Sequence, residues 1–145
     1  MTTLKQRTSD LIAPAFYNVW RASDRYTTKV LKGGRNSGKS TTISLKIILH
    51  LMKYPVNALV VRKVGETLKD SVYEQLLEAI EILGVSEFWE KRVSPLSLKY
   101  TPTGTRIIFR GADMPEKIKS IKSSKHPIAV LWIEELAEFK TEDED

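Results

Sequence analysis

The sequence lacks cysteine, and it lacks any apolar run long enough to cross a membrane. Without cysteine, neither a disulfide framework nor a zinc–thiolate site is possible, and a cytosolic setting fits that absence. No apolar run approaches the ~20 residues that span a bilayer, and the polar start, Met1 to Lys5, has no secretory core. With 145 residues, of which 41% are hydrophobic and 28% charged, the chain is expected to form one soluble globular domain.

The charges are distributed unevenly along the chain. The net charge is +5, yet residues 134–145 carry seven acidic side chains against one lysine. Residues 1–133 therefore hold 22 basic and 11 acidic residues, a surplus of +11. A basic body suits a polyanionic partner such as DNA or a nucleotide, and a merely solvated basic surface is an equal alternative. The same two alternatives apply to one group of lysines, Lys117, Lys119, Lys122 and Lys125.

One stretch fits the phosphate-binding pattern G-x-x-x-x-G-K-[ST] at every fixed position. It consists of Gly33, Gly34, Arg35, Asn36, Ser37, Gly38, Lys39 and Ser40. In such a loop the backbone N–H groups point at a phosphate chain, the lysine reaches the β- and γ-phosphates, and the hydroxyl ligates Mg²⁺. We expect a strand at residues 28–32 and a helix at residues 40–52, whose N-terminus attracts anions. The alternative is a chance Gly-Lys-Ser in a glycine-rich loop.

The remainder of the chain alternates predicted strands and helices. The helix expected after the first buried strand begins with a capping box, Thr67 with Asp70, and ends at Gly84. The order predicts an α/β fold with right-handed crossovers, in which phosphate ligands lie at the carboxyl ends of strands. The expected elements are a strand at 57–62, a helix at 67–83, a hairpin of 97–100 with 105–109, a basic loop at 111–126 and a strand at 128–133.

The strand expected at residues 128–133 ends in two acids, Glu134 and Glu135. A nucleotide hydrolase needs an acid in the Mg²⁺ shell and a group that orients the attacking water, and this pair supplies both. The alternative is a strand that returns to solvent on charged residues. Arg35 either reaches the γ-phosphate and stabilises transition-state charge or faces solvent. Arg62, which ends its strand, either faces the nucleotide or a neighbouring subunit or is simply solvated.

Taken together, these residues resemble the large terminase subunit of tailed bacteriophages, over nearly the whole chain. Four segments carry the resemblance in the same order: residues 16–20 (FYNVW), residues 33–40 (GGRNSGKS), residues 60–63 (VVRK) with 70–76 (DSVYEQL), and residues 131–139 (LWIEELAEF). An arginine in the phosphate loop together with a strand that ends in an acid pair is fairly specific to this family.

The resemblance implies roles for individual residues. Arg35 would act on the γ-phosphate in cis, and Glu135 would be the catalytic glutamate. Ser40 and Glu134 would hold Mg²⁺, although many relatives of this ATPase class have Asp where Glu134 stands. Tyr17 would lie near the adenine. The implied nucleotide-binding residues are Tyr17, Gly33, Gly34, Arg35, Asn36, Ser37, Gly38, Lys39, Ser40 and Thr41.

The family also implies a fold and an activity. The fold would be a P-loop NTPase three-layer sandwich with a mostly parallel sheet. ATP and Mg²⁺ would be the cofactors, and ATP hydrolysis would drive double-stranded DNA into a capsid. The partners of the full-length family protein would be DNA, a small terminase subunit and a portal protein, in the host cell cytoplasm, with no membrane and with possible homo-oligomers.

Compared with the family, the chain is short. We expect a partial ATPase domain over 1–145, divided into a lead-in (1–27), a P-loop core (28–139) and an acidic end (140–145), without the nuclease domain of the family. The strand that the family places between the phosphate-loop strand and the acidic strand is missing. Two unpaired edges would then face a gap, which favours rearrangement, self-association or low stability.

Two other classes of function remain open at this point. One is a different P-loop enzyme, such as a helicase-like ATPase or a nucleotide kinase, although a kinase would need an arginine-rich lid and only scattered arginines are present. The other is a basic DNA-binding or assembly module whose phosphate loop is vestigial.

Overall fold

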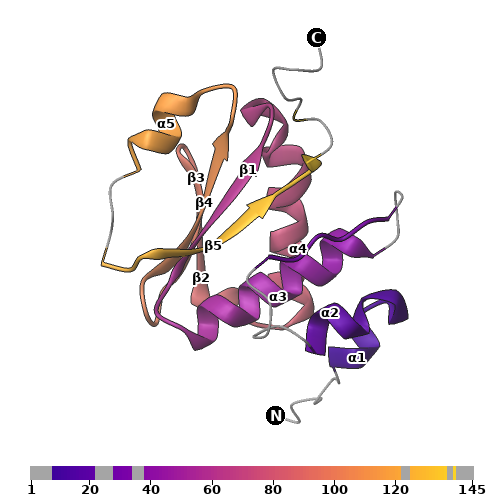
Figure 1. Ribbon diagram of the computed structural model, residues 1–145. Coiled ribbons are helices and arrows are strands. Elements are labelled where there is room, and N and C mark those ends of the chain that lie inside the picture. Colours follow the sequence, from indigo (N-terminus) through magenta and orange to yellow (C-terminus); the bar gives the residue numbers. More distant parts are fainter. Residues whose placement is uncertain (1–7, 22–27, 34–37, 122–124, 137–138, 140–145) are drawn as a thin grey trace.

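The computed structural model describes residues 8–21, 28–33, 38–121, 125–136 and 139. These residues form an α/β fold around one mixed five-stranded sheet (Figure 1). The helices are α1 (Thr8–Leu11), α2 (Tyr17–Arg21), α3 (Lys39–Lys53), α4 (Glu74–Ile82) and α5 (Pro115–Lys119). The strands are β1 (Asn57–Arg62), β2 (Trp89–Val93), β3 (Leu96–Tyr100), β4 (Thr105–Gly111) and β5 (Ile128–Ile133).

Strand β1 has a parallel neighbour on each side. The strand order is β2-β3-β4-β1-β5, and β1 pairs in parallel with both β4 and β5. The pairs β2–β3 and β3–β4 are antiparallel. The predicted α/β class is confirmed, but the expectation of a mostly parallel sheet is wrong. Short turns join β2, β3 and β4, and such turns connect only antiparallel strands.

The hydrophobic core lies between the sheet and the helices α3 and α4 (Figure 1). Val60 pairs with Trp132 across β1 and β5, and both side chains are buried in this core. The neighbouring pairs alternate to the other face of the sheet, where Leu131 is 59% exposed and Ile133 40% exposed. The described residues therefore show one well-covered face, and the three-layer P-loop sandwich stays a prediction.

The strand expected at residues 28–32 is not present, and this prediction was wrong. The whole segment is described, and it forms neither a helix nor a strand, and Val30 within it is 67% exposed. A strand needs a neighbouring strand to accept its hydrogen bonds. Among the described residues, β5 is an edge strand and pairs only with β1. One of the two expected unpaired edges is thus present, while self-association and low stability stay predictions.

Several other expectations can be checked against the elements. The strands at 57–62 and 128–133 and the helix after the phosphate loop are confirmed. The predicted hairpin is confirmed as β3 and β4, whereas β2 and α5 were missed. The helix predicted at 67–83 is an α-helix only from Glu74 to Ile82, preceded by a 3₁₀ turn (Gly65–Thr67) and a π-helical turn (Lys69–Tyr73).

The predictions for the two ends of that helical region have different outcomes. The predicted capping box is wrong, because the Thr67 hydroxyl donates to the Val64 carbonyl oxygen at 2.7 Å and makes no side-chain cap. At the other end Gly84 has a φ of 68°, and the Val85 N–H donates to the Ile80 carbonyl oxygen at 3.2 Å. This is the left-handed ending that glycine favours, as predicted. No helix among the described residues is long and apolar enough to span a membrane.

Asn57 ties the start of β1 to both parallel neighbours. Its side chain is 1% exposed. The Asn57 amide donates to the His126 carbonyl oxygen at 3.1 Å, just before β5, and its oxygen accepts from the Arg106 N–H at 2.8 Å in β4. Buried side-chain amides of this kind are costly to leave unpaired, so both bonds fix the register of the three strands.

At the opposite end, the loops after β1 and β4 approach each other closely. The Gly65 N–H donates to the Asp113 carboxylate at 3.1 Å. The Asp113 N–H donates to the Lys63 carbonyl oxygen at 3.0 Å, and the Ala112 N–H donates to the Arg62 carbonyl oxygen at 2.9 Å. A side chain on Gly111 would lie 2.5 Å from the Gly65 nitrogen. Only glycine permits this approach.

We predict that Gly111→Ala lowers the free energy of unfolding by about 2 kcal/mol, because the added methyl group would overpack a backbone that cannot yield easily. Gly65→Ala is the matched control. Its methyl group would meet the Gly111 Cα at 3.3 Å, a contact that small shifts relieve. Urea unfolding of both variants provides the measurement. Equal losses from the two substitutions would contradict this account of the loop contact.

Candidate functional site

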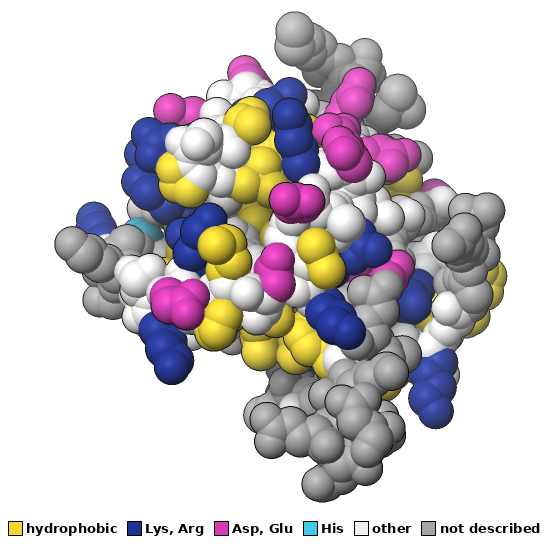
Figure 2. Space-filling view, turned by 90° about the horizontal axis from the view of Figure 1, so that it is seen from above, with side chains coloured by type: hydrophobic (Ala, Val, Ile, Leu, Met, Phe, Trp, Pro, Cys, Tyr) yellow, Lys and Arg dark blue, Asp and Glu magenta, His cyan; other side chains and the backbone are white. Residues whose placement is uncertain are grey.

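The carboxyl ends of β1, β4 and β5 meet at one edge of the sheet, because these three strands are parallel. This edge is the upper one in Figure 1, and Figure 2 views the molecule from that side. Basic and acidic side chains both lie on the face that Figure 2 shows. In an open α/β sheet, ligands bind at this edge.

The described part of the phosphate loop leads directly into α3. Gly38 precedes the helix with a φ of 80°, a left-handed conformation that glycine adopts without strain. The Lys39 Nζ donates to the Gly33 carbonyl oxygen at 3.4 Å, so the lysine side chain turns back over the loop. Gly34, Arg35, Asn36 and Ser37 lie outside the described residues.

Thr42 was not among the predicted site residues, yet it secures the end of the loop. Its hydroxyl donates to the Gly38 carbonyl oxygen at 2.9 Å, and its N–H donates to the same oxygen at 3.0 Å. Thr42 is 1% exposed, whereas the predicted Thr41 is exposed. The sequence did offer a sign of this role, because Thr42 is the third of three consecutive hydroxyl residues at 40–42 and falls on the buried side of α3.

The lead-in packs beside the loop. A side chain on Gly38 would lie 3.2 Å from the Ala13 Cβ, so the loop and the 3₁₀ turn at Pro14–Phe16 nearly touch. Tyr17, the first residue of α2, is half-buried against the core. The Lys46 ammonium donates to the Trp20 carbonyl oxygen at 3.1 Å and so anchors α2 on α3. The structure thus brings the segment of Tyr17 to the phosphate-loop side of the molecule.

Glu134 and Glu135 directly follow β5. The Glu134 N–H donates to the Val61 carbonyl oxygen at 2.9 Å, which extends the pairing with β1 by one residue. Glu135 has a φ of 52°, an unfavourable conformation for a residue with a side chain, so the backbone turns sharply there.

The surroundings of Glu134 shift the pKa of its carboxyl in both directions. Burial raises the pKa of its carboxyl above the ordinary value of 4.5, and the nearby Glu135 adds to that rise. Lys39, Arg62 and a hydrogen bond from the Trp132 side chain lower the pKa. The interaction with Lys39 shows that the structure brings the start of α3 and the end of β5 together, although 95 positions separate these residues in the sequence.

Arg62 is the partner of Glu135. Its guanidinium lies 3.1 Å from the Glu135 carboxylate, with the arginine side chain 16% exposed and the glutamate 45% exposed. It also donates to the Ser71 hydroxyl at 3.0 Å and to the Thr67 carbonyl oxygen at 3.4 Å. The arginine is therefore paired within the chain and not simply solvated, while a role toward the nucleotide or a neighbouring subunit stays a prediction. It positions Glu135 against the turns that precede α4, and sequence reasoning missed this role.

The donor chemistry at this edge fits Mg²⁺ bound together with a phosphate chain. The described residues contain no group of three or more His, Asp or Glu side chains that would hold a metal without help. Mg²⁺ takes oxygen ligands, and it is usually bound by one or two carboxylates together with substrate phosphates. Ser40 in the first turn of α3 and the partly buried Glu134 offer such oxygens.

We predict that Glu134→Gln raises the free energy of unfolding near neutral pH in metal-free buffer. The folded-state pKa lies above the unfolded value of 4.5, so the stability that this carboxyl contributes is lost as pH rises through the folded pKa. The amide keeps the shape without the charge, and its advantage should vanish below the unfolded value. Denaturant unfolding over a pH series, with the exposed Glu87→Gln as control, measures it. A destabilised Glu134→Gln near neutral pH would contradict the account.

Comparisons with known proteins show the family of the chain. The family model described as phage terminase large subunit matches residues 25–145. The large terminase subunit of Bacillus phage SPP1 is 53% identical over 142 residues, which cover 97% of this chain and 34% of that protein. The PBSX phage terminase large subunit of Bacillus subtilis (strain 168) is 42% identical over 116 residues, 80% of this chain and 26% of that protein. The chain thus spans about a third or less of these relatives, and it belongs to the phage terminase large subunit family.

Proposed function

We propose that the chain provides the ATP-binding and hydrolysing site of a viral DNA-packaging motor. The observation that carries the proposal is the electrostatic interaction of Lys39, at the start of α3, with Glu134, the first residue after β5. A phosphate-binding lysine and an acid pair on one sheet edge are the groups that nucleotide hydrolysis requires. Membership in the terminase family supports DNA packaging as the purpose of that hydrolysis.

Each residue has a defined task in this proposal. The loop from Gly33 to Ser40, followed by Thr41, binds the phosphates, and Lys39 neutralises charge on the β- and γ-phosphates. Tyr17 lies near the adenine of the bound nucleotide. Ser40 and Glu134 hold Mg²⁺, which screens the phosphate charge when it is bound. Arg35 stabilises charge that develops on the γ-phosphate.

Glu135 acts on the attacking water. An ionised carboxylate can accept a proton from water and orient its lone pair toward the γ-phosphate. The ion pair with Arg62 fixes the direction of the Glu135 carboxylate, because the guanidinium is itself held by the Ser71 hydroxyl. Arg62 is accordingly a positioning residue, since it acts through Glu135.

The wider setting follows from the family. We propose double-stranded DNA as the polymer that the full-length protein moves, with a small terminase subunit and a portal protein as partners in the host cytoplasm. Endonuclease activity would belong to the full-length family protein, in a part that this chain does not match. The basic surplus of residues 1–133 supports a polyanionic partner.

The test is a titration of labelled ATP with Mg²⁺ against the wild-type chain and variants. Lys39→Ala is expected to weaken binding at least tenfold, because it removes the cation that faces the phosphates. Glu135→Gln is expected to keep binding. Any phosphate release measured with double-stranded DNA present should fall by ~10²–10⁴ in that variant, the usual contribution of a general base.

Lys53→Ala is the matched control, because it removes an exposed lysine from the opposite end of the same helix. It should leave both binding and turnover unchanged. Equal ATP binding by the wild type and Lys39→Ala would contradict the nucleotide site. It would favour a basic module with a vestigial loop.

A further inference from the structure

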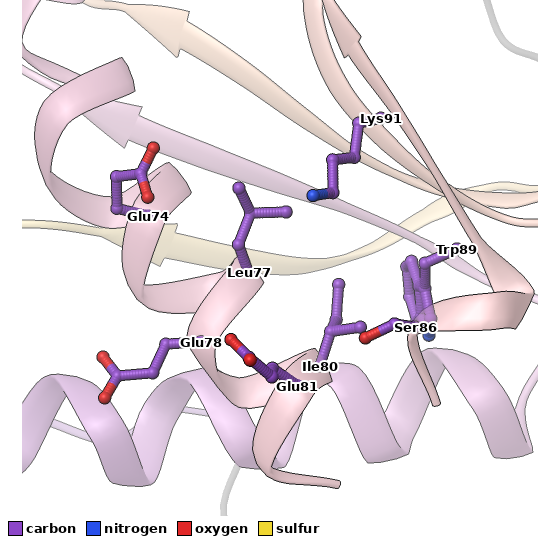
Figure 3. Close-up of a pocket in the computed structure, with 8 residues that line it drawn as sticks. All are labelled: Glu74, Leu77, Glu78, Ile80, Glu81, Ser86, Trp89 and Lys91. Carbon is purple, nitrogen blue, oxygen red and sulfur yellow. The ribbon is translucent and has the colours of Figure 1, made fainter. Parts of the chain in front are cut away.

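A pocket lies between α4 and β2, at the edge of the sheet opposite to β5 (Figure 3). Its volume is about 490 Å³. Leu77 and Ile80 of α4 and the Trp89 ring of β2 form its apolar lining. Because β2 and β5 occupy the two ends of the strand order, this pocket is separate from the candidate nucleotide site.

The rim of the pocket is acidic. Glu74, Glu78 and Glu81 are spaced along one side of α4, and all three are exposed. No ion pair to any of them occurs within the described part of the chain. Lys91 on β2 provides the single positive charge of the lining, so the pocket is net negative on a chain whose net charge is +5. This local reversal of charge favours a cationic occupant.

Trp89 gives an independent sign of a missing partner. Its side chain is only 6% exposed, and its indole N–H finds no acceptor. In Figure 3 the indole nitrogen lies at the end of the Trp89 ring that is nearest Ser86. A buried donor of this kind is normally paired, and a carbonyl oxygen is its usual acceptor. A polypeptide backbone supplies carbonyl oxygens, whereas a simple cation does not.

The position of β2 also favours a polypeptide. Among the described residues β2 pairs with no strand other than β3, so its outer edge is open to a further strand, although the Arg92 carbonyl oxygen already accepts from the Tyr73 hydroxyl at 3.5 Å. An added extended segment would pair with this edge and place its side chains against alternate positions of the strand.

We propose that this pocket is a docking site for a segment of a partner protein that carries arginine or lysine beside a nonpolar side chain. The nonpolar group fills the space between Leu77 and Trp89. The cation is neutralised by Glu78 and Glu81, and a backbone carbonyl accepts from the Trp89 indole once the ring has moved enough to uncover its buried N–H.

The test uses ¹⁵N-labelled chain and a short acetylated, amidated peptide, Gly-Arg-Leu-Arg-Leu-Gly, with Gly-Glu-Leu-Glu-Leu-Gly as the matched acidic peptide. Three tryptophans give three indole N–H signals in the NMR spectrum. The basic peptide is expected to shift the Trp89 signal in a saturable way and to leave those of Trp20 and Trp132 in place. The acidic peptide is expected to shift none.

Two double variants separate this site from general electrostatics. Glu78→Lys with Glu81→Lys should weaken basic-peptide binding at least tenfold. Glu87→Lys with Glu90→Lys makes the same change of charge at exposed positions outside the pocket and should weaken it less than twofold. Because every substituted side chain is exposed, the backbone spectra should remain those of the folded protein. Glu78→Gln with Glu81→Gln provides a milder variant, expected to lie in between, should the lysine variant unfold.

Three results would overturn the proposal. The first is equal binding of the acidic and basic peptides. The second is equal weakening by the two lysine variants, which would show only long-range attraction. The third is binding of spermine as tight as that of the peptide with full displacement of it, which would make the pocket a site for small polycations. Because none of these readouts involves ATP, they leave the proposed nucleotide site untouched.

Discussion

Parallel pairing on both sides of β1 is the constraint on which the remainder of the structure depends. It directs the carboxyl ends of β4, β1 and β5 to one edge, and Asn57 fixes their relative register from the other end. Parallel strands cannot be joined by tight turns, so long connections must cross the sheet. The connection from β1 to β4 contributes α4, which covers the core face together with α3, the helix that precedes β1. The site is a consequence of this pairing, because it brings Arg62 and the acid pair to neighbouring strand ends.

At that edge the charges are balanced across several elements. Two adjacent glutamates would repel each other if both were ionised without compensation. Arg62 from the end of β1 forms an ion pair with Glu135, and Lys39 from the start of α3 lowers the pKa of Glu134. The positive φ of Glu135 and the burial of Glu134 both oppose stability. Such costs are typical of groups held in place for binding or chemistry rather than for folding.

Local patterns in the sequence predicted the elements whose structure is determined locally. The apolar runs gave β1 and β5 with their observed bounds, and Gly84 marked the end of α4. The strand predicted at residues 28–32 was wrong because a short segment before a phosphate loop becomes a strand only if a neighbouring strand edge is available, which the sequence does not show. The strand β2 was missed because four of its five side chains are exposed, so it carries little hydrophobic signal. The predicted capping box is absent because the Thr67 hydroxyl donates to the Val64 carbonyl oxygen instead of capping the helix.

The sequence predicted the individual residues of the candidate site but not the contacts between them. Motif spacing identified Lys39, Glu134 and Glu135, but the ion pair of Arg62 with Glu135 depends on the register between β1 and β5. Thr42 was missed because it lies just outside the motif, on the buried side of α3.

The central claim is that the start of α3 and the end of β5 form one nucleotide site. Mn²⁺ bound with a non-hydrolysable ATP analogue broadens NMR signals of nearby nuclei and so tests this directly. The account predicts broadening of the backbone signals of Lys39 and Ser40 together with Glu134 and Glu135, and none at Trp89. Broadening of only one of these two segments, or of neither, would contradict it.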